Sequence, residues 1–135
     1  MSSLENVHAG QTLPGMTRVC DNVQSFFYNA ALWNAHRIHY DLPYATDAEG
    51  YPGLVVPGPL LGDWMSQVVD HWIDGTGAVF EKFEYSNRLA VYVGDEVQAG
   101  GTVTEVADGC ATIELFVRNA NGDVVAPGKA RVRLA

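Results

Sequence analysis

The chain has 135 residues, a length that predicts one domain over residues 1–135. It is 47% hydrophobic and 18% charged, which is ordinary globular usage and excludes a disordered tail or a fibre. The formal charge of -8 argues against nucleic-acid binding, because that function requires a basic surface to neutralise phosphates. The first residues lack the basic start and apolar run of a signal peptide, and no stretch has the length of a membrane span. We therefore expect a cytoplasmic protein that binds neither nucleic acid nor membrane.

The sequence contains no familiar metal or nucleotide motif. Its two cysteines, Cys20 and Cys110, are far apart and lack CxxC spacing, so we expect reduced thiols in strands. Phosphate-loop, Rossmann, Gly-x-Ser-x-Gly and His-Glu-x-x-His patterns do not occur in it. We therefore expect no metal and no nucleotide cofactor.

The first third of the chain predicts a strand and a short helix. Residues 12–20 are predicted as the strand, with a break at Pro14 and Gly15. Asp21 is a predicted N-cap of a helix that ends near Trp33. The apolar residues that indicate this helix by their spacing are Phe26, Phe27, Ala30 and Ala31.

Residues 34–53 show no periodicity and are interrupted by proline and glycine. A long irregular stretch in a compact domain is usually either functional or disordered. Its aromatic content favours an ordered, functional segment, and the aromatic residues are Tyr40, Tyr44 and Tyr51.

The clearest pattern predicts a helix over residues 60–73. Apolar residues recur at steps of one and three, which places a broad apolar face on one side of the helix. Pro59 suits the first helical turn, and Gly75 and Gly77 follow the predicted end. Two tryptophans on this face predict deep burial against a sheet. The residues of the face are Leu60, Leu61, Trp64, Met65, Val68, Val69, Trp72 and Ile73.

The remaining chain predicts four antiparallel strands, and Asn121-Gly122 predicts a two-residue hairpin turn between the last two. In the last strand basic residues alternate with apolar ones, so one face is predicted to be packed. The order of elements predicts an α+β fold in which an antiparallel sheet wraps around one long helix. The predicted strands are 79–93, 96–107, 110–119 and 123–134.

The densest polar cluster runs from Asn34 to Asp41 and contains His36 and His39. Histidine titrates near neutral pH, so a partly buried one can accept and return a proton. A neighbouring amide such as that of Asn34 would orient the ring or hold a water molecule. Histidines in loops are also often held by backbone groups without any chemical role, and the spacing alone leaves both interpretations open.

A second candidate lies where residues 55–59 lead into the long helix. Backbone N–H groups at a helix N-terminus are unpaired, and the helix dipole favours negative charge there. Because Pro57 and Pro59 have no N–H, Gly58 is the free donor of this short stretch, and it suits an oxyanion. The same pattern is also a common helix start.

These residues resemble a known family. The blocks Trp33–Asp41, Tyr44-Ala45 and Tyr51–Leu60 resemble MaoC-like hydratases and dehydratases of the hotdog superfamily. The resemblance points to the subgroup that contains 3-hydroxyacyl-thioester dehydratases and mesaconyl-CoA hydratases. The distal half, from Phe83 through Val93-Gly94-Asp95 to the last strand, is similar to the family's sheet. The resemblance covers nearly the whole chain and implies one hotdog fold.

The resemblance also implies an activity and assigns residues to it. The family's catalytic histidine falls on His39, its motif asparagine on His36 and its aspartate on Asn34, while Gly58 matches the glycine that binds the thioester oxygen. The implied reaction is reversible addition of water to an α,β-unsaturated acyl thioester of CoA or acyl carrier protein, without a cofactor. We expect the substrate to be bound by Gly58 together with Tyr40 and Val56.

Two departures from the family pattern leave an alternative open. Asn34 cannot act as a carboxylate base, and Pro57 stands where many relatives have histidine. The alternative is a non-catalytic acyl-thioester-binding subunit of a heteromeric hydratase. A hotdog thioesterase that uses Asp63 as its carboxylate is a third possibility. Since many relatives carry two hotdog units in one chain, the family implies a homodimer or a heteromer with a second hotdog subunit.

Overall fold

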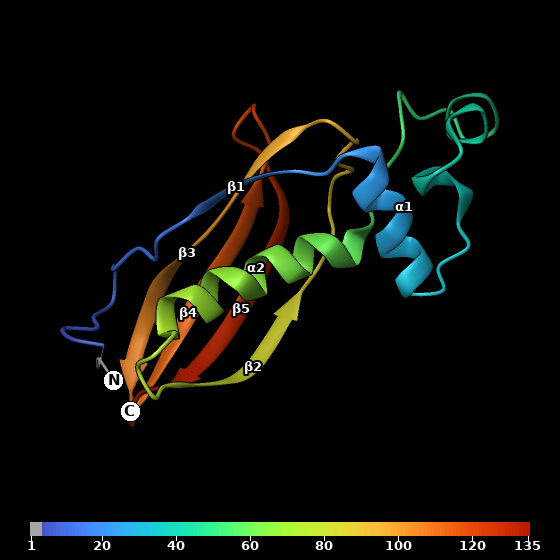
Figure 1. The fold of residues 1–135 in the computed structure, drawn as a ribbon. Helices are drawn as coiled ribbons and strands as arrows, with labels where there is room; N and C mark the ends of the chain where they lie inside the picture. Colours follow the sequence, from blue (N-terminus) through green and yellow to red (C-terminus); the bar gives the residue numbers. More distant parts are fainter. Residues whose placement is uncertain (1–3) are drawn as a thin grey trace.

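The computed structural model describes residues 4–135; Met1, Ser2 and Ser3, the start of the segment that lacks the signal-peptide pattern, lie outside the described residues. Figure 1 shows a curled sheet that wraps around one long helix, with a smaller helical region at one end. The elements are β1 (Met16–Val19), α1 (Asn22–Ala31), the short helical turns η1 (Arg37–His39) and η2 (Tyr44–Ala48), α2 (Gly58–Ile73), β2 (Val79–Tyr85), β3 (Glu96–Ala107), β4 (Cys110–Arg118) and β5 (Val124–Arg133).

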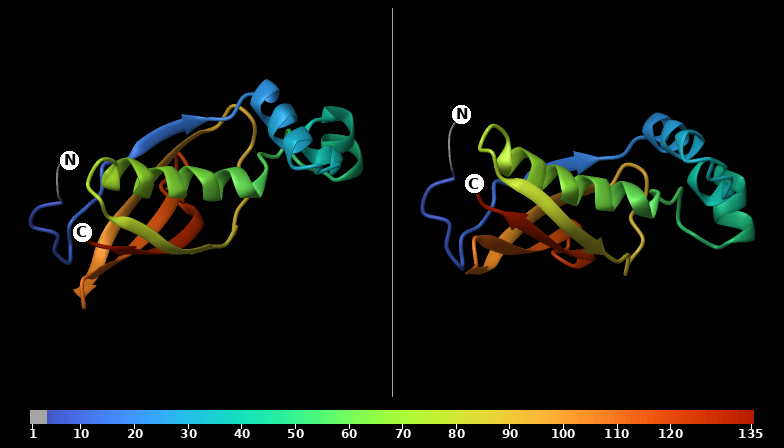
Figure 2. Two further views of the ribbon diagram at one scale, coloured as in Figure 1. Left: turned by 60° about the horizontal axis from the view of Figure 1, so that its bottom comes forward. Right: turned by 90° about the horizontal axis from the view of Figure 1, so that it is seen from below.

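The five strands form one antiparallel sheet in the order β1-β3-β4-β5-β2. Helix α2 lies in its concave side and contacts β2, β3, β4 and β5 (Figures 1 and 2). The predicted α+β arrangement is therefore confirmed. Within residues 4–135, no helix combines the length and the apolar character that crossing a membrane requires.

Helix α2 supplies the centre of the core. Its apolar face is buried as predicted, and Met65, Val68 and Val69 are fully inaccessible to solvent. Each such side chain contributes roughly 1.5–3 kcal/mol by leaving water. Trp64 is buried but Trp72 is only half-buried, so the prediction of deep burial is wrong for the second tryptophan. On the helix Trp72 points to the same side as Met65, seven residues or about two turns earlier. It lies one residue before the end of α2 at Ile73, so its partial exposure goes with the end of the helix and not with another side of it.

Two predicted strands are shorter in the structure. β1 covers Met16–Val19 only, and Thr12 is joined to the sheet by an isolated bridge beyond the expected break. β2 ends at Tyr85 instead of residue 93. There the ladder stops, because the N–H groups of Arg88 and Leu89 both point to one acceptor, the carbonyl of Val125. Residues 86–93 instead cross from β5 toward the start of α2.

The two hairpin turns of the sheet have different geometries. Asn121-Gly122 lies in the β4–β5 turn, but positive φ occurs only at Gly122, so the predicted two-residue turn is wrong. Asn119 instead uses its side chain to cap the backbone of this longer turn. Asp108-Gly109 connects β3 to β4 with positive φ at both residues, which is the two-residue hairpin geometry.

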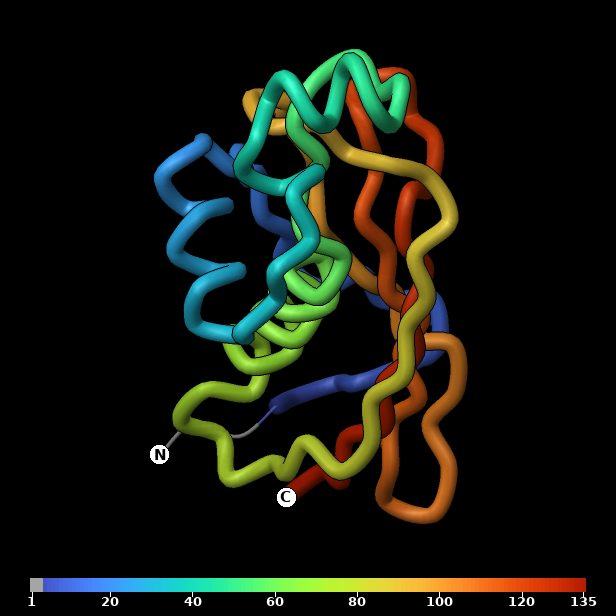
Figure 3. Tube along the Cα trace, turned by 90° about the vertical axis from the view of Figure 1, so that its right-hand side faces the viewer, coloured from blue at the N-terminus to red at the C-terminus, as the bar shows by residue number. Residues whose placement is uncertain are grey.

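The helical region packs against the start of α2, and Figure 3 looks onto it from its own end of the molecule. Asp21 caps α1 as predicted, since its Oδ1 accepts the N–H of Gln24 at 2.7 Å. The buried face of α1 carries Ser25 and Asn29, whereas Phe26 and Phe27 are more than half exposed. Residues 34–53, predicted as an ordered irregular segment, contain η1 and η2.

Candidate active site

His39 ends the short turn η1 and is fixed at both its ring and its backbone. The side chain is 7% exposed, and its Nδ1 lies 2.6 Å from the carbonyl oxygen of Val55. The Ser25 hydroxyl donates to the His39 carbonyl at 2.7 Å, which ties η1 to the buried face of α1. Because a carbonyl only accepts, Nδ1 carries the proton, and Nε2 keeps its lone pair free to accept one.

The surroundings of His39 keep this ring neutral. Burial lowers the pKa of His39 below its ordinary value; the hydrogen bond to the Val55 carbonyl partly offsets this effect, and the neighbouring His36 makes a smaller lowering contribution. A neutral imidazole with a free Nε2 can act as a general base at neutral pH. The local structure therefore prepares His39 to accept a proton.

His39 and Gly58 line the same pocket, which has a volume of about 260 Å³. Gly58 is the first residue of α2, so its N–H has no acceptor within the helix and lies at the positive end of the helix dipole. The pocket thus combines a proton acceptor with a backbone donor suited to a negatively charged oxygen. The residues that line it are His39, Val55, Val56, Gly58, Leu61, Asn87, Arg88, Leu89, Ala90 and Val91.

A short antiparallel contact closes this pocket. The N–H of Val56 donates to the carbonyl of Val91 at 2.7 Å, and Val55 forms an isolated bridge with Tyr92. Val56 is 3% exposed and lines the pocket as an apolar wall. This contact brings residues 87–91 opposite the start of α2, although the two segments are far apart in sequence.

The other predicted site residues lie outside this pocket. Asn34 and Tyr40 line a separate hollow of about 350 Å³ beside α1. The side-chain oxygen of Asn34 accepts the backbone N–H of His36 at 3.1 Å, and the Tyr40 hydroxyl donates to a backbone carbonyl. The exposed His36 ring meets the His39 ring edge to face, with centroids 5.8 Å apart. The structure brings His39, Gly58 and Val56 together, and it holds His36 next to them.

Asp63, Tyr44 and Tyr51 do not line the His39 pocket either. The exposed Asp63 accepts the Tyr28 hydroxyl at 2.5 Å. Burial and this hydrogen bond both raise the pKa of Tyr28. Tyr44 donates to Glu49, and Tyr51 packs against the ring of Tyr92.

One wall of the pocket was missed by the sequence interpretation. Residues 87–90 were expected to belong to a regular strand, yet they line the pocket across from Gly58. Asn87 is the nearest of them: a Cβ at Gly58 would lie 2.4 Å from its Nδ2 atom. The only local signal was the polar run from Ser86 to Arg88 at the end of an otherwise alternating strand.

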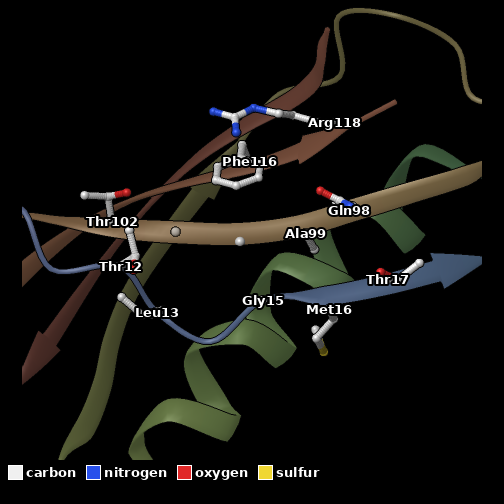
Figure 4. A pocket seen from close by; sticks show the side chains of 12 residues that line it. Thr12, Leu13, Gly15, Met16, Thr17, Gln98, Ala99, Thr102, Phe116 and Arg118 are labelled. Atoms are coloured by element: carbon white, nitrogen blue, oxygen red, sulfur yellow. The ribbon is translucent and has the colours of Figure 1, made fainter. Parts of the chain in front are cut away.

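A larger concavity of about 410 Å³ is lined by residues of β1 and the segment before it, of β3 and of β4 (Figure 4). Arg118 stacks on the Phe116 ring there, with its guanidinium carbon 3.9 Å from the ring centroid. Arg118 is the single ionisable side chain among its lining residues, so this concavity offers no acid–base pair. Within residues 4–135, no three His, Cys, Asp or Glu side chains gather as possible metal ligands.

Comparisons with known proteins agree with this fold. A sequence model of the family described as hydroxyacyl-thioester dehydratase type 2 matches residues 8–93, which is more than half of the chain. A mesaconyl-C(4)-CoA hydratase of Chloroflexus aurantiacus is 54% identical over 46 residues, covering 34% of this chain but only 16% of that protein's length.

Solved structures extend the similarity to the whole fold. The (R)-hydratase from A. caviae involved in PHA biosynthesis superposes with a TM-score of 0.87 at 23% identity, over 98% of this chain and 100% of that one. The ChsH1-ChsH2 complex from Mycobacterium tuberculosis gives a TM-score of 0.82 at 22% identity, over 95% of this chain and 98% of that one. The predicted hotdog fold is thus confirmed. With the family match over residues 8–93, the chain belongs to the hydroxyacyl-thioester dehydratase type 2 family.

Proposed function

We propose that this protein catalyses the reversible addition of water to an α,β-unsaturated acyl thioester. The observation that carries the proposal is the shared pocket of His39 and Gly58, which holds a neutral imidazole and an unpaired backbone N–H. Membership of the hydroxyacyl-thioester dehydratase type 2 family supports the same reaction class. The substrate would be a thioester of CoA or of acyl carrier protein.

In the proposed mechanism, His39 and Gly58 act on opposite ends of the conjugated system. Nε2 of His39 takes a proton from water while the water oxygen bonds to C3 of the enoyl group. The C2=C3 electron pair moves toward the carbonyl, and the resulting enolate oxygen accepts the N–H of Gly58. His39 then returns its proton to C2 and the thioester carbonyl is restored. One water has been added across one double bond, with no net oxidation, so the reaction needs no redox cofactor.

The two groups are sufficient for a substantial rate enhancement. A preorganised donor at a developing oxyanion contributes roughly 3 kcal/mol to transition-state stability. General-base catalysis by a positioned histidine contributes roughly 10²–10⁴-fold. Asn34 lacks a carboxylate, and its side-chain oxygen accepts a hydrogen bond from the His36 backbone, so we assign proton transfer to His39 alone. The neighbouring His36 contributes to the lowering of the pKa of His39.

Replacement of His39 tests the proposal directly. Hydration of enoyl-CoA substrates of several chain lengths would be followed by the loss of ultraviolet absorbance of the conjugated thioester. We expect His39→Ala to lower turnover at least about 10²-fold. His71→Ala is the matched control, because His71 is exposed in the last turn of α2, outside the pocket. Near-normal turnover by a folded His39→Ala protein would contradict the mechanism.

A second candidate function is an acyl-thioester-binding subunit without activity of its own. It is motivated by Asn34 and Pro57 and by the similarity to a two-component complex, ChsH1-ChsH2. In that case the active partner would be a second hotdog subunit, whereas the catalytic proposal also fits a homodimer. Hydration by the purified chain alone would exclude the non-catalytic role. Release of free CoA from an acyl-CoA would instead indicate a thioesterase, which cleaves the bond that hydration leaves intact.

A further inference from the structure

Asn87 belongs to a segment that is anchored at both ends across the pocket. On one side, the N–H groups of Ser86 and Arg88 donate to carbonyls of Pro127 and Val125 in β5, at 3.0 and 2.9 Å. On the other side, residues 91–93 pair with residues 54–56, just before α2. These contacts give the Asn87 backbone a defined position opposite the first turn of α2.

The Asn87 amide lies directly over Gly58. A Cβ at residue 58 would be 2.4 Å from Asn87 Nδ2 and 3.0 Å from its Cγ, so only glycine leaves room for the amide in this position. Bond geometry places a Cβ about 2.5 Å from its own backbone nitrogen. Asn87 Nδ2 and the Gly58 nitrogen are therefore at most about 4.9 Å apart.

That separation suits two donors to one oxygen. Two N–H groups that each reach an acceptor at about 2.9 Å can be up to about 5.8 Å apart. Asn87 also lines the pocket that contains His39 and Gly58. In the part of the chain that the structure describes, residues 4–135, the Asn87 amide forms no hydrogen bond, so both of its N–H groups are available to a ligand.

We propose that Asn87 is the second donor of the oxyanion site, and that its Nδ2–H acts with the Gly58 N–H on the thioester oxygen. Asn87 stays neutral throughout and transfers no proton; it stabilises the negative charge that the oxygen gains when water adds to C3. The inference rests on the proposed hydratase function. It also explains why residue 58 is glycine on steric grounds: a side chain there would separate the two donors.

The test compares Asn87→Ala and Asn87→Asp with the unaltered protein. Removing one preorganised oxyanion donor costs roughly 10²–10³-fold in kcat, so we expect a loss of this size in Asn87→Ala, with KM changed less than about threefold. Asn87→Asp keeps the shape but replaces the donor by a carboxylate, and we expect an equal or larger loss. Asn121→Ala is the control, because Asn121 is an exposed asparagine in the β4–β5 turn. A merely structural role would lower the free energy of unfolding rather than kcat alone.

A second readout separates this inference from the proposed function. The carbonyl stretch of a bound, unreactive saturated acyl-CoA, labelled with ¹³C at the thioester, reports hydrogen bonding to its oxygen. We expect the stretch to shift to lower frequency in the unaltered protein, and the shift to be smaller in Asn87→Ala. The role of Asn87 is overturned if the unaltered protein binds and hydrates thioesters and the Asn87→Ala protein has the same kcat and the same shift of the carbonyl stretch. If His39→Ala hydrates as fast as the unaltered protein but Asn87→Ala loses the shift, the His39 mechanism fails and the Asn87 contact stands.

Discussion

Gly62 in α2 provides a quantitative test of how the end of β2 packs on the central helix. A Cβ at residue 62 would lie 2.6 Å from the Cε1 and Cζ atoms of the Tyr85 ring. Carbon atoms normally approach to about 3.5–4.0 Å, so the ring would have to move by roughly 1 Å. The ring is stacked on Phe83 at a centroid distance of 5.4 Å, which opposes that movement. Overpacking of this kind costs roughly 1–3 kcal/mol.

The same substitution removes a glycine from a helix interior, which favours folding by roughly 0.8–1.0 kcal/mol. The clash is the larger effect, so we expect Gly62→Ala to lower the free energy of unfolding by about 1 kcal/mol. In a Tyr85→Ala background the clash is gone, and Gly62→Ala should raise the free energy of unfolding by about 1 kcal/mol.

Urea unfolding of the four proteins in this double-mutant cycle measures the sign change and the coupling energy. The three atoms nearest to a Cβ at residue 62 all belong to the Tyr85 ring, so the Tyr85→Ala background serves as the control. If Gly62→Ala stabilises the protein equally in both backgrounds, Tyr85 does not pack on the helix at Gly62 as the structure places it.

The remaining predictions concern titration and thiol chemistry. Because burial lowers the pKa of His39, the unfolded chain binds a proton at this residue more readily than the folded one below about pH 6.5. We therefore expect the free energy of unfolding to decrease as the pH drops below this value. Urea unfolding at a series of pH values would detect this fall, and a His39→Gln protein with the same acid dependence would contradict it. Cys20 is 1% exposed, and burial raises its pKa to about 11. We therefore expect a thiol reagent to label Cys110 and not Cys20 in the folded protein. Mass spectrometry of the labelled peptides measures this difference. Equal labelling of both thiols would show that Cys20 is not buried.

Local patterns in the sequence predicted most of the regular elements. The apolar spacing of residues 60–73 is a property of one face of one helix, and α2 extends only two residues further at its start. The N-cap at Asp21 is likewise local, since its oxygen bonds to an N–H three residues away. The β3 strand has the predicted limits, β4 is one residue shorter at its end, and β5 is one residue shorter at each end.

Predictions failed where a distant partner decides the outcome. The end of β2 depends on how Arg88 and Leu89 meet the Val125 carbonyl, which no periodicity in residues 79–93 records. The short helix α1 buries Ser25 because its hydroxyl holds the His39 carbonyl, while the adjacent Phe26 is left exposed. The apolar spacing of α1 therefore indicated a helix correctly without indicating which side of it is covered.

The sequence by itself determined the elements and singled out two chemical groups, an imidazole in a polar cluster and a free amide at a helix start. Tertiary structure alone decided that His39 and Gly58 line one pocket, that Asn34 faces another, and that Asn87 lies over Gly58. The reason is that helix and strand patterns report neighbours within a few residues along the chain. The antiparallel pairing of residues 54–56 with residues 91–93 depends instead on strand register and on the packing of α2 in the curled sheet.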